Sequence, residues 1–225
     1  MRVSLIIPAL NEAECLGPLL AEIPMGLIHE VIVVDNGSTD RTAEVAQAAG
    51  ALVVDEPRRG YGFACAAGTA ATEGEVLVFM DGDGSFVPGE LSDLLGPLLR
   101  DEADLVLGSR MREDGQRRIA MPFHQRFGNL LFAWFLRLRF SLALTDLGPY
   151  RAIRRELLLT LNMRERTFGW PLEMIIKTAR QRKRIVEVSV SYRPRFAGKS
   201  KVGGTLRGSI LTAYRFFLVT LRYVF

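Results

Sequence analysis

VLVFMDGDGSFVP, residues Val76–Pro88, is an apolar run that stops abruptly at two aspartates. Asp81 and Asp83 lie two residues apart at the mouth of this run, and a glycine follows each of them. Two like charges this close repel each other, and each carboxylate favours solvation over burial. A buried strand that ends in such a pair indicates that something compensates the charge beyond its carboxyl end.

Similar apolar runs recur along the first half of the chain and predict buried strands. The five predicted strands are residues 2–8, 30–35, 51–55, 75–81 and 104–109. Helices are expected between them, including a small-residue helix in the glycine-containing stretch RRGYGFACAAGTAAT. Strands that are solid apolar runs and alternate with helices predict an α/β fold, in which a mostly parallel sheet has helices on both faces.

Polar side chains at the turns suggest how the first two helices begin. Asn11 with Glu14 three residues later resembles a capping box, which would start the first helix. Ser38 or Thr39, in the turn NGSTD, is expected to cap the second helix, and Gly50 is a fitting stop for it.

Polar residues also follow three of the predicted strands at the point where each strand ends. They are Asn11 and Glu12 after the first strand, Asp35 and Asn36 after the second, and Asp81 and Asp83 after the fourth. Ligands of parallel α/β sheets bind beyond the carboxyl ends of the strands. Because three separate features agree in position, the sequence predicts a ligand site at this edge of the sheet.

Asp81 and Asp83 are the candidate metal ligands. Alternate residues of an extended segment point to the same side, so the two carboxylates together suit a hard divalent cation, which prefers oxygen ligands and also binds diphosphate. The glycines at positions 82 and 84 let a ligand approach the backbone. The alternative interpretation is a solvated surface turn.

Asp35, Asn36 and Gly60 are further candidates for ligand binding. An asparagine amide offers both a donor and an acceptor, and so can pair with a nucleobase edge, although DNGSTD is also typical of a turn and helix cap. The glycines of GYGFACAAG have the wrong spacing and position for a dinucleotide fingerprint, which argues against NAD. Gly60 belongs either to a loop near a diphosphate or to a tight turn.

The second half of the chain is strongly basic. Residues 1–108 contain 5 Lys and Arg against 18 Asp and Glu, a net charge of −13, whereas residues 109–225 contain 24 against 7, a net charge of +17. This asymmetry favours an anionic partner, unless the charges only form a solvated surface. The candidate phosphate-binding side chains are Arg110, Arg126, Arg195, Lys199 and Lys201.

Few other residues carry a chemical signal. Asp146, in LTDLGPYRAI, is a lone carboxylate between apolar runs and is a candidate base, ligand or helix cap. Trp170 and Glu173 either line a site or pack inside the protein. The two cysteines form no CxxC pair, which suits a reducing compartment.

Two apolar and basic segments predict helices that either lie in a membrane interface or pack on the domain. FGNLLFAWFLRLRF spans residues 127–140 and LRGSILTAYRFFLVTLRYVF spans residues 206–225. The arginines of the second segment fall near one helix face, and Phe, Leu and Tyr form another, as in interfacial helices. Neither segment is a clean transmembrane helix. A strand is expected between them at residues 185–192.

The motifs SLIIPALNE, VVDNGSTDRT, VFMDGDGSFVP, GSR, TDLGPYRAI and GKSKVGG together resemble the family 2 glycosyltransferases. Within that family they are most similar to the dolichyl- or polyprenyl-phosphate sugar synthases. The resemblance implies one GT-A domain over residues 1–225, with a nucleotide-sugar half at 1–110 and an acceptor half at 111–225. It also implies an inverting transfer from a UDP- or GDP-linked sugar to a polyprenyl phosphate.

The resemblance further implies roles for individual residues. On the donor side it implies Pro8, Leu10 and Glu12 near the nucleoside, Asn36 at the base, and Asp81 and Asp83 holding Mg²⁺ or Mn²⁺ with the diphosphate. Near the acceptor phosphate it implies Arg110, Arg126, Lys199 and Lys201. A phosphate acceptor is already anionic, so Asp146 would act as a base only for a hydroxyl acceptor.

Three departures from the family pattern matter. Asn36 replaces the commoner Asp, Ser85 replaces a Gln that mannosyl-phosphate synthases often have as a further metal ligand, and no transmembrane helix follows the catalytic part. The expected location is cytoplasmic and peripheral at the inner face of the membrane, with no nucleic-acid partner. The alternatives are a transferase with a soluble hydroxyl acceptor and a non-catalytic nucleotide-binding module.

Overall fold

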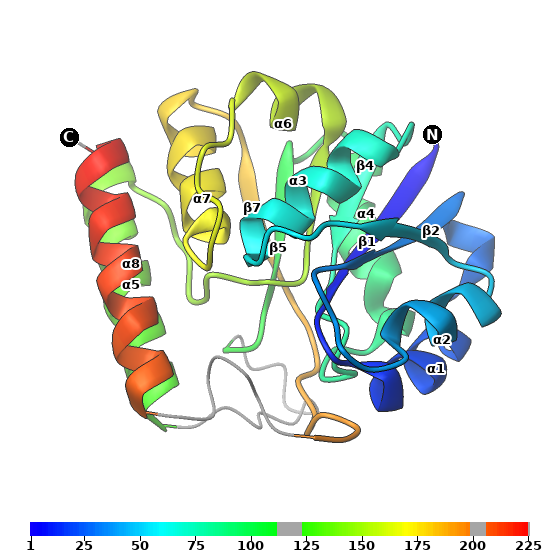
Figure 1. Ribbon diagram of the computed structural model, residues 1–225. Coiled ribbons are helices and arrows are strands. Elements are labelled where there is room, and N and C mark those ends of the chain that lie inside the picture. The colour runs from blue at the N-terminus through cyan, green and yellow to red at the C-terminus, as the bar shows by residue number, and fades with distance from the viewer. Residues whose placement is uncertain (112–122, 199–205, 225) are drawn as a thin grey trace.

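The computed structural model describes residues 1–111, 123–198 and 206–224, with the side chains of 123–129 and 206–213 left out of the description. Within these ranges, seven strands form one sheet in the order β3-β2-β1-β4-β6-β5-β7 (Figure 1). The strands are β1 (Val3–Ala9), β2 (Glu30–Asp35), β3 (Leu52–Asp55), β4 (Val76–Phe79), β5 (Leu105–Ser109), β6 (Arg151–Arg154) and β7 (Ile185–Ser189).

The sheet is mostly parallel, as the sequence predicts. Strand β6 is the exception, because it runs antiparallel to both β4 and β5 and separates them in the sheet. It is a strand that the sequence does not predict: it has only four residues and begins and ends with arginine. The insertion of β6 brings the loop before Arg151 to the edge where β4 ends.

Helices cover both faces of the sheet. On one face pack α1 (Ala13–Ala21), α2 (Thr42–Ala48) and α4 (Leu91–Leu99), and on the other α3 (Tyr61–Ala71), α6 (Arg155–Thr160) and α7 (Trp170–Arg180). Two short 3-10 helices, η1 (Met25–Leu27) and η2 (Pro88–Glu90), complete the first face. Helices α5 (Phe123–Phe140) and α8 (Leu206–Val224) lie side by side beyond α7 (Figure 1).

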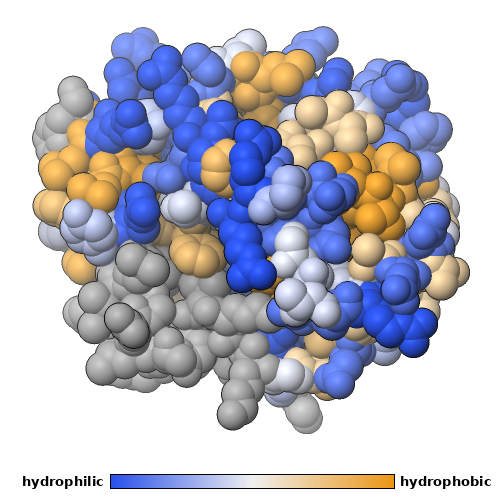
Figure 2. Space-filling model, in the orientation of Figure 1, coloured by the Kyte–Doolittle hydropathy of each residue, from blue (hydrophilic) through white to orange (hydrophobic). Residues whose placement is uncertain are grey.

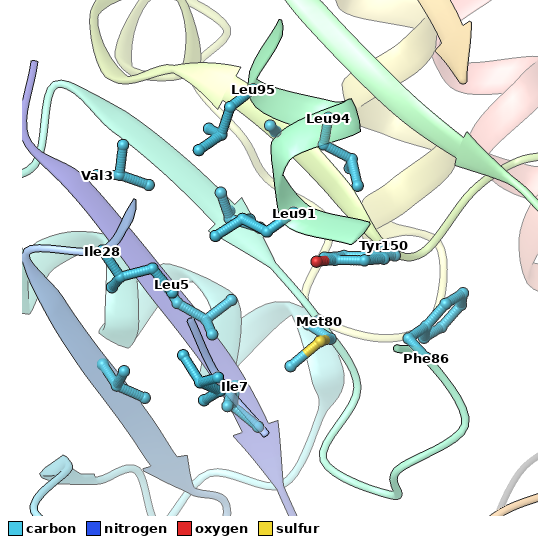
Figure 3. Packing of buried hydrophobic residues seen from close by; sticks show 14 of the residues in the cluster. Val3, Leu5, Ile7, Ile28, Met80, Phe86, Leu91, Leu94, Leu95 and Tyr150 are labelled. Carbon is cyan, nitrogen blue, oxygen red and sulfur yellow. The ribbon is translucent and has the colours of Figure 1, made fainter. Parts of the chain in front are cut away.

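Alternation along the strands divides the core between the two faces. Leu5 and Ile7 point to the face where Leu91 and Tyr150 pack (Figure 3). Ile6, between them, belongs to the cluster on the opposite face, together with the buried Phe79 and Trp170. Each fully buried large apolar side chain contributes about 1.5–3 kcal/mol relative to an exposed one, so this packing fixes the strand ends firmly.

The predicted N-terminal helix caps are wrong, whereas the predicted stop at Gly50 is confirmed, because α2 ends at Ala48 and Gly50 follows with a φ of 83°. Helix α1 begins at Ala13 without a side-chain cap, and Asn11 instead adopts a φ of 52° and accepts a hydrogen bond from the backbone N–H of Thr39 at 2.7 Å. In return the Ser38 hydroxyl accepts a hydrogen bond from the Asn11 N–H at 2.9 Å. Because β1 pairs with β2, their following loops are neighbours, and these side chains tie the loops together.

Candidate active site

The predicted site residues converge at the carboxyl edge of the sheet. Register pairs Ala9 at the end of β1 with Asp35 at the end of β2, and β4 lies on the other side of β1. The structure brings to this edge Pro8, Leu10, Glu12, Asp35, Asn36, Gly60, Asp81, Asp83, Arg110 and Asp146. Lys199, Lys201 and the side chain of Arg126 lie outside the described residues.

The Asp81 carboxyl has a raised pKa. Burial raises the pKa of its carboxyl, the nearby Asp83 raises it further, and the resulting pKa is about 7. The charges of Arg110 and Arg151 and a hydrogen bond from the Tyr61 hydroxyl oppose this rise. The chain therefore compensates the repulsion between the two aspartates only in part.

Asp83 is held in a defined orientation by its own loop. Its Oδ1 accepts hydrogen bonds from the Ser85 backbone N–H at 2.9 Å and from the Ser85 hydroxyl at 2.6 Å. Its Oδ2 lies 4.0 Å from a guanidinium nitrogen of Arg195. Ser85 is buried, and its two hydrogen bonds fix the orientation of the Asp83 carboxylate.

The segment after β7, residues 190–198, is hydrogen-bonded along this loop and forms a clasp over it. Arg193 donates from its backbone to the Ser85 carbonyl at 2.9 Å and from its Nε to the Gly84 carbonyl at 2.7 Å. The Phe196 N–H donates to the Asp83 carbonyl at 3.1 Å. Gly84 has a φ of +75°, and a Cβ there would lie 2.2 Å from the Phe196 ring, which explains the second glycine of the motif.

Arg195 connects the clasp to the loop after β1. Its Nη2 lies 2.6 Å from the Glu12 carboxylate, so this predicted phosphate-binding arginine has an ion-pair partner in the chain. The two side chains line a pocket of about 390 Å³ together with Cys15 and Arg41. The pocket lies between the clasp and the residues that follow β1 and β2, and Arg195, which lines it, is 4.0 Å from the Asp83 carboxylate.

Asn36 is buried, and its amide is committed to the backbone. Its Nδ2 donates to the carbonyl of Glu56 at 2.9 Å and to that of Arg58 at 2.8 Å, and its Oδ1 accepts from the Gly60 N–H at 2.7 Å. A Cβ at Gly60, whose φ is +151°, would lie 2.4 Å from the Arg166 carbonyl oxygen. Asn36 therefore fixes the turn over residues 56–60, in which Gly60 has a conformation and a close contact that need glycine. Asp35 fixes its own loop by accepting from the Ser38 N–H at 2.9 Å.

Arg110 and Asp146 form a bidentate ion pair. The arginine Nε and Nη2 donate to the two carboxylate oxygens at 2.7 and 2.9 Å, and its backbone N–H donates at 2.9 Å. The Asp146 side chain is 0% exposed and that of Arg110 is 13% exposed. Although burial works against its charge, Asp146 raises the pKa of Arg110 above its ordinary value. The guanidinium also lies over the Tyr192 ring, with its carbon 5.1 Å from the ring centroid.

Several residues of this edge are absent from the sequence-based predictions. The Glu187 carboxylate accepts hydrogen bonds from the backbone N–H groups of Thr145 and Asp146, and so positions the loop of the Arg110 ion pair. The Tyr61 hydroxyl forms a hydrogen bond with the Asp81 carboxylate. The buried guanidinium of Arg151 donates hydrogen bonds to the Gly148 and Pro171 carbonyls. The signal that could have found Arg151 is a charged residue at the start of a short apolar run.

Comparison with known proteins identifies the family of the chain. Residues 4–161 match the model of glycosyl transferase family 2. The chain belongs to glycosyl transferase family 2. The predicted family, the GT-A fold and the assignment as a nucleotide-sugar-dependent enzyme are thereby confirmed.

This glycosyltransferase is similar to an uncharacterized relative and to two proteins whose names give different substrates or products. It is 44% identical over 217 residues to an uncharacterized glycosyltransferase of Mycobacterium tuberculosis, covering 96% of this chain and 97% of the relative. It is 34% identical to an undecaprenyl-phosphate mannosyltransferase of Micrococcus luteus, covering 92% and 90%. Its fold matches that of glucosyl-3-phosphoglycerate synthase from M. tuberculosis in complex with Mn²⁺, UDP and glucosyl-3-phosphoglycerate, with a TM-score of 0.80, 26% identity, and coverage of 99% and 80%.

Proposed function

We propose that this glycosyltransferase moves a sugar, with inversion, from a nucleotide sugar to a polyprenyl phosphate at a membrane surface and requires Mg²⁺ or Mn²⁺. The observation that carries the proposal is the pair Asp81 and Asp83 at the carboxyl edge of the sheet. The chain neutralises this pair only in part and leaves the pKa of Asp81 at about 7. A cation brought by the donor diphosphate would complete the compensation.

The residues present fit a hard divalent cation. Asp81 and Asp83 offer carboxylate oxygens, and Ser85 already holds Asp83 in place. Within the described residues no cluster of three or more His, Cys, Asp or Glu side chains could hold a metal, so we assign the remaining ligand positions to diphosphate and water. When bound, the cation would neutralise the charge that develops on the departing diphosphate.

On the donor side, the loops after β1 and β2 would enclose the nucleoside. Pro8, Leu10, Glu12 and Asp35 line that side of the edge. We assign Asn36 a positioning role, because its amide already bonds the backbone at Glu56, Arg58 and Gly60. The nucleobase would then contact the turn that Asn36 fixes, and this turn would help to select the base.

On the acceptor side, a phosphate oxygen would attack the anomeric carbon of the sugar. The bond from that carbon to the diphosphate breaks as the new carbon–oxygen bond forms on the opposite face. An anionic phosphate needs no general base, which fits the full engagement of Asp146 by Arg110. Arg110 would hold the phosphate, and Asp146 would position Arg110. The roles of Arg126, Lys199 and Lys201 in acceptor binding stay predictions.

The helix pair α5–α8 supports an acceptor in a membrane. Neither helix contains Asp or Glu, and each exposes large apolar side chains. The exposed ones are Leu130, Leu131, Trp134 and Leu138 of α5 and Tyr214, Phe217, Leu218 and Leu221 of α8. Figure 2 shows hydrophobic side chains over the left edge of the molecule, where α8 lies in Figure 1. An acid-free apolar surface with arginines suits an anionic membrane interface.

Contact of this kind with a membrane surface does not require a helix that crosses the membrane. Among the described residues, no helix combines the length and the apolar character that crossing a membrane requires. We propose that the chain reaches its acceptor from the cytoplasmic face through the α5–α8 surface. The relative from Micrococcus luteus is named for an undecaprenyl-phosphate acceptor, and its name supports polyprenyl phosphate as the acceptor.

A soluble phosphorylated acceptor is the second candidate. The fold neighbour that contains glucosyl-3-phosphoglycerate supports it. Such an acceptor attacks through a hydroxyl, so a base would have to take its proton. Asp146 would have to leave its ion pair with Arg110 to do so.

One experiment separates these candidates. The protein is incubated with Mn²⁺, a panel of radiolabelled UDP- and GDP-sugars, and either polyprenyl phosphate in anionic vesicles or 3-phosphoglycerate. We expect solvent-extractable, lipid-linked label that disappears with EDTA and in Asp83→Asn. Glu75→Gln is the matched control, because Glu75 precedes the same strand at its opposite end. Folded protein that labels no lipid with any donor would contradict the proposal, and label on 3-phosphoglycerate alone would establish the second candidate.

A further inference from the structure

A second pocket lies on the sheet face that α3, α6 and α7 cover. It has a volume of about 230 Å³ and is separate from the pocket beside Glu12. Its walls come from the later turns of α3, at Ala66 and Thr69, from α6, and from the segment that leads into α7. Because a helix rises 1.5 Å per residue, Thr69 is about 12 Å along α3 from Tyr61 at the active-site end.

The polar side chains that line this pocket are mainly hydrogen-bond donors. Arg155 and Arg166 both line it. The Arg166 guanidinium lies over the Phe63 ring, with its carbon 5.7 Å from the ring centroid, and its charge lowers the pKa of Glu56, but the hydrogen bonds and ion pairs of the described residues give neither guanidinium a carboxylate within bonding distance. The Nε of Arg155 and the indole Nε1 of Trp170 are buried without a hydrogen-bond partner there. Trp170 itself is 1% exposed. Buried donors without an acceptor are costly, and native structures rarely leave them so.

The rest of the lining is apolar. Leu158 and Met163 belong to it, and no Asp or Glu is among the described residues that line the pocket. Thr69 adds no free donor, because its hydroxyl donates to the Cys65 carbonyl at 2.8 Å. Two guanidinium groups above an apolar floor match an anion that carries a short hydrocarbon part, and guanidinium binds phosphate in a bidentate manner.

We propose that this pocket binds a small organic phosphate, with the phosphate between Arg155 and Arg166 and the apolar part against Leu158 and Met163. The site is additional to the donor and acceptor sites. Its volume lies below the usual range for drug-sized ligands, so a phosphate monoester with a small apolar group fits it better than a nucleotide.

The pocket adjoins the turn that carries the donor site. The Arg166 carbonyl accepts a hydrogen bond from the Phe63 N–H at 3.2 Å and is the atom that excludes a side chain at Gly60. Tyr61, between these two residues, bonds Asp81. A phosphate held by the Arg166 side chain would steady this backbone contact, so the ligand would stabilise the turn at the start of α3.

Two tryptophans make the site easy to observe. The chain contains only Trp134 and Trp170, so its ¹⁵N-labelled form gives two indole N–H signals, and Trp134→Phe assigns them. On titration with phenyl phosphate we expect the Trp170 signal to shift in a saturable way while the Trp134 signal stays in place. Arg155→Gln and Arg166→Gln should each weaken this binding at least tenfold, because each removes a charge-assisted hydrogen-bonding group.

Matched controls complete the experiment. Arg164→Gln alters an exposed arginine of the same segment that does not line the pocket, and should leave the titration unchanged. Arg166→Lys keeps the charge and should retain part of the affinity. Exchange of the Phe63 amide should slow when phenyl phosphate is bound. The proposal would be overturned if the Trp170 signal did not move, or if neutral benzyl alcohol shifted it equally. It would also be overturned if folded Arg155→Gln and Arg166→Gln bound phenyl phosphate as tightly as the parent protein, or if exchange of the Phe63 amide were unchanged.

Discussion

The ion pair between Arg110 and Asp146 gives the sharpest prediction about the proposed acceptor side. Asp146→Asn keeps the size of the side chain but removes the charge that faces a guanidinium only 13% exposed. Removing one partner of a buried pair costs about 3–5 kcal/mol, since the other charge stays buried. We expect a loss of roughly 3 kcal/mol in unfolding free energy, the low end of that range, because the asparagine oxygen still accepts one hydrogen bond.

At about 2–4 °C per kcal/mol for a chain of this length, the loss corresponds to a melting temperature lower by about 6–12 °C. Urea unfolding followed by circular dichroism measures the free energy directly. Glu187→Gln is the matched comparison, because it alters the carboxylate that holds the Asp146 backbone and leaves the ion pair intact. Its loss of stability should be smaller.

A double-mutant cycle on the transfer rate tests the role of Asp146. If Asp146 acts through Arg110, then Asp146→Asn combined with Arg110→Gln should be no slower than Arg110→Gln alone, because residues that share one interaction are not additive. Additive losses, or an acidic limb of the pH–rate profile that vanishes in Asp146→Asn, would refute this reasoning and make Asp146 a base.

The remaining predictions concern the donor side and the membrane. Asn36→Asp should lose about 2–4 kcal/mol in urea unfolding, because two backbone carbonyls lose their donor and face a carboxylate. Ser85→Ala should weaken Mn²⁺ binding about tenfold in a calorimetric titration, because Asp83 loses a charge-assisted hydrogen bond worth about 1.5 kcal/mol. Mn²⁺ affinity should fall about tenfold per pH unit below pH 7 and level off above it, because the pKa of Asp81 is about 7 and its proton must leave. Trp134→Asp should lower flotation with anionic vesicles about tenfold, because a large exposed apolar side chain is lost from α5.

A specific result would contradict each of these predictions. Asn36→Asp as stable as the parent would show that the amide is not needed in the turn, and unchanged Mn²⁺ affinity in Ser85→Ala would remove the orienting role. A pH-independent Mn²⁺ affinity between pH 5.5 and 7 would contradict the raised pKa. Met25→Asp changes an apolar side chain that is 58% exposed on η1, and flotation lowered equally by both substitutions would show that α5 is no special surface.

Much of the fold is readable in the sequence because its strands are solid apolar runs. The alternation of these runs with helices predicts the parallel sheet and the edge at which Asp81 and Asp83 lie. Strand β6 is not readable, since four residues between arginines have no strand period and gain their pairing only from β4 and β5.

The site is readable only where a residue directly follows a strand. The partners of Asn36 come from a turn about 20 residues later, which is brought back by the pairing of β2 with β3. Arg110 and Asp146 are 36 residues apart, and their pairing depends on β6 lying beside β5. Pairs of this kind are set by topology, so composition and spacing do not reveal them.

Mn²⁺ binding followed by electron paramagnetic resonance tests the central claim most directly, because free Mn²⁺ gives the signal and bound Mn²⁺ loses it. We predict that UDP or GDP strengthens Mn²⁺ binding by the parent protein and by Glu75→Gln, and that Asp81→Asn and Asp83→Asn abolish this gain while remaining folded. Nucleotide-promoted Mn²⁺ binding that is equal in all four proteins would contradict the assignment of the two aspartates as the metal site.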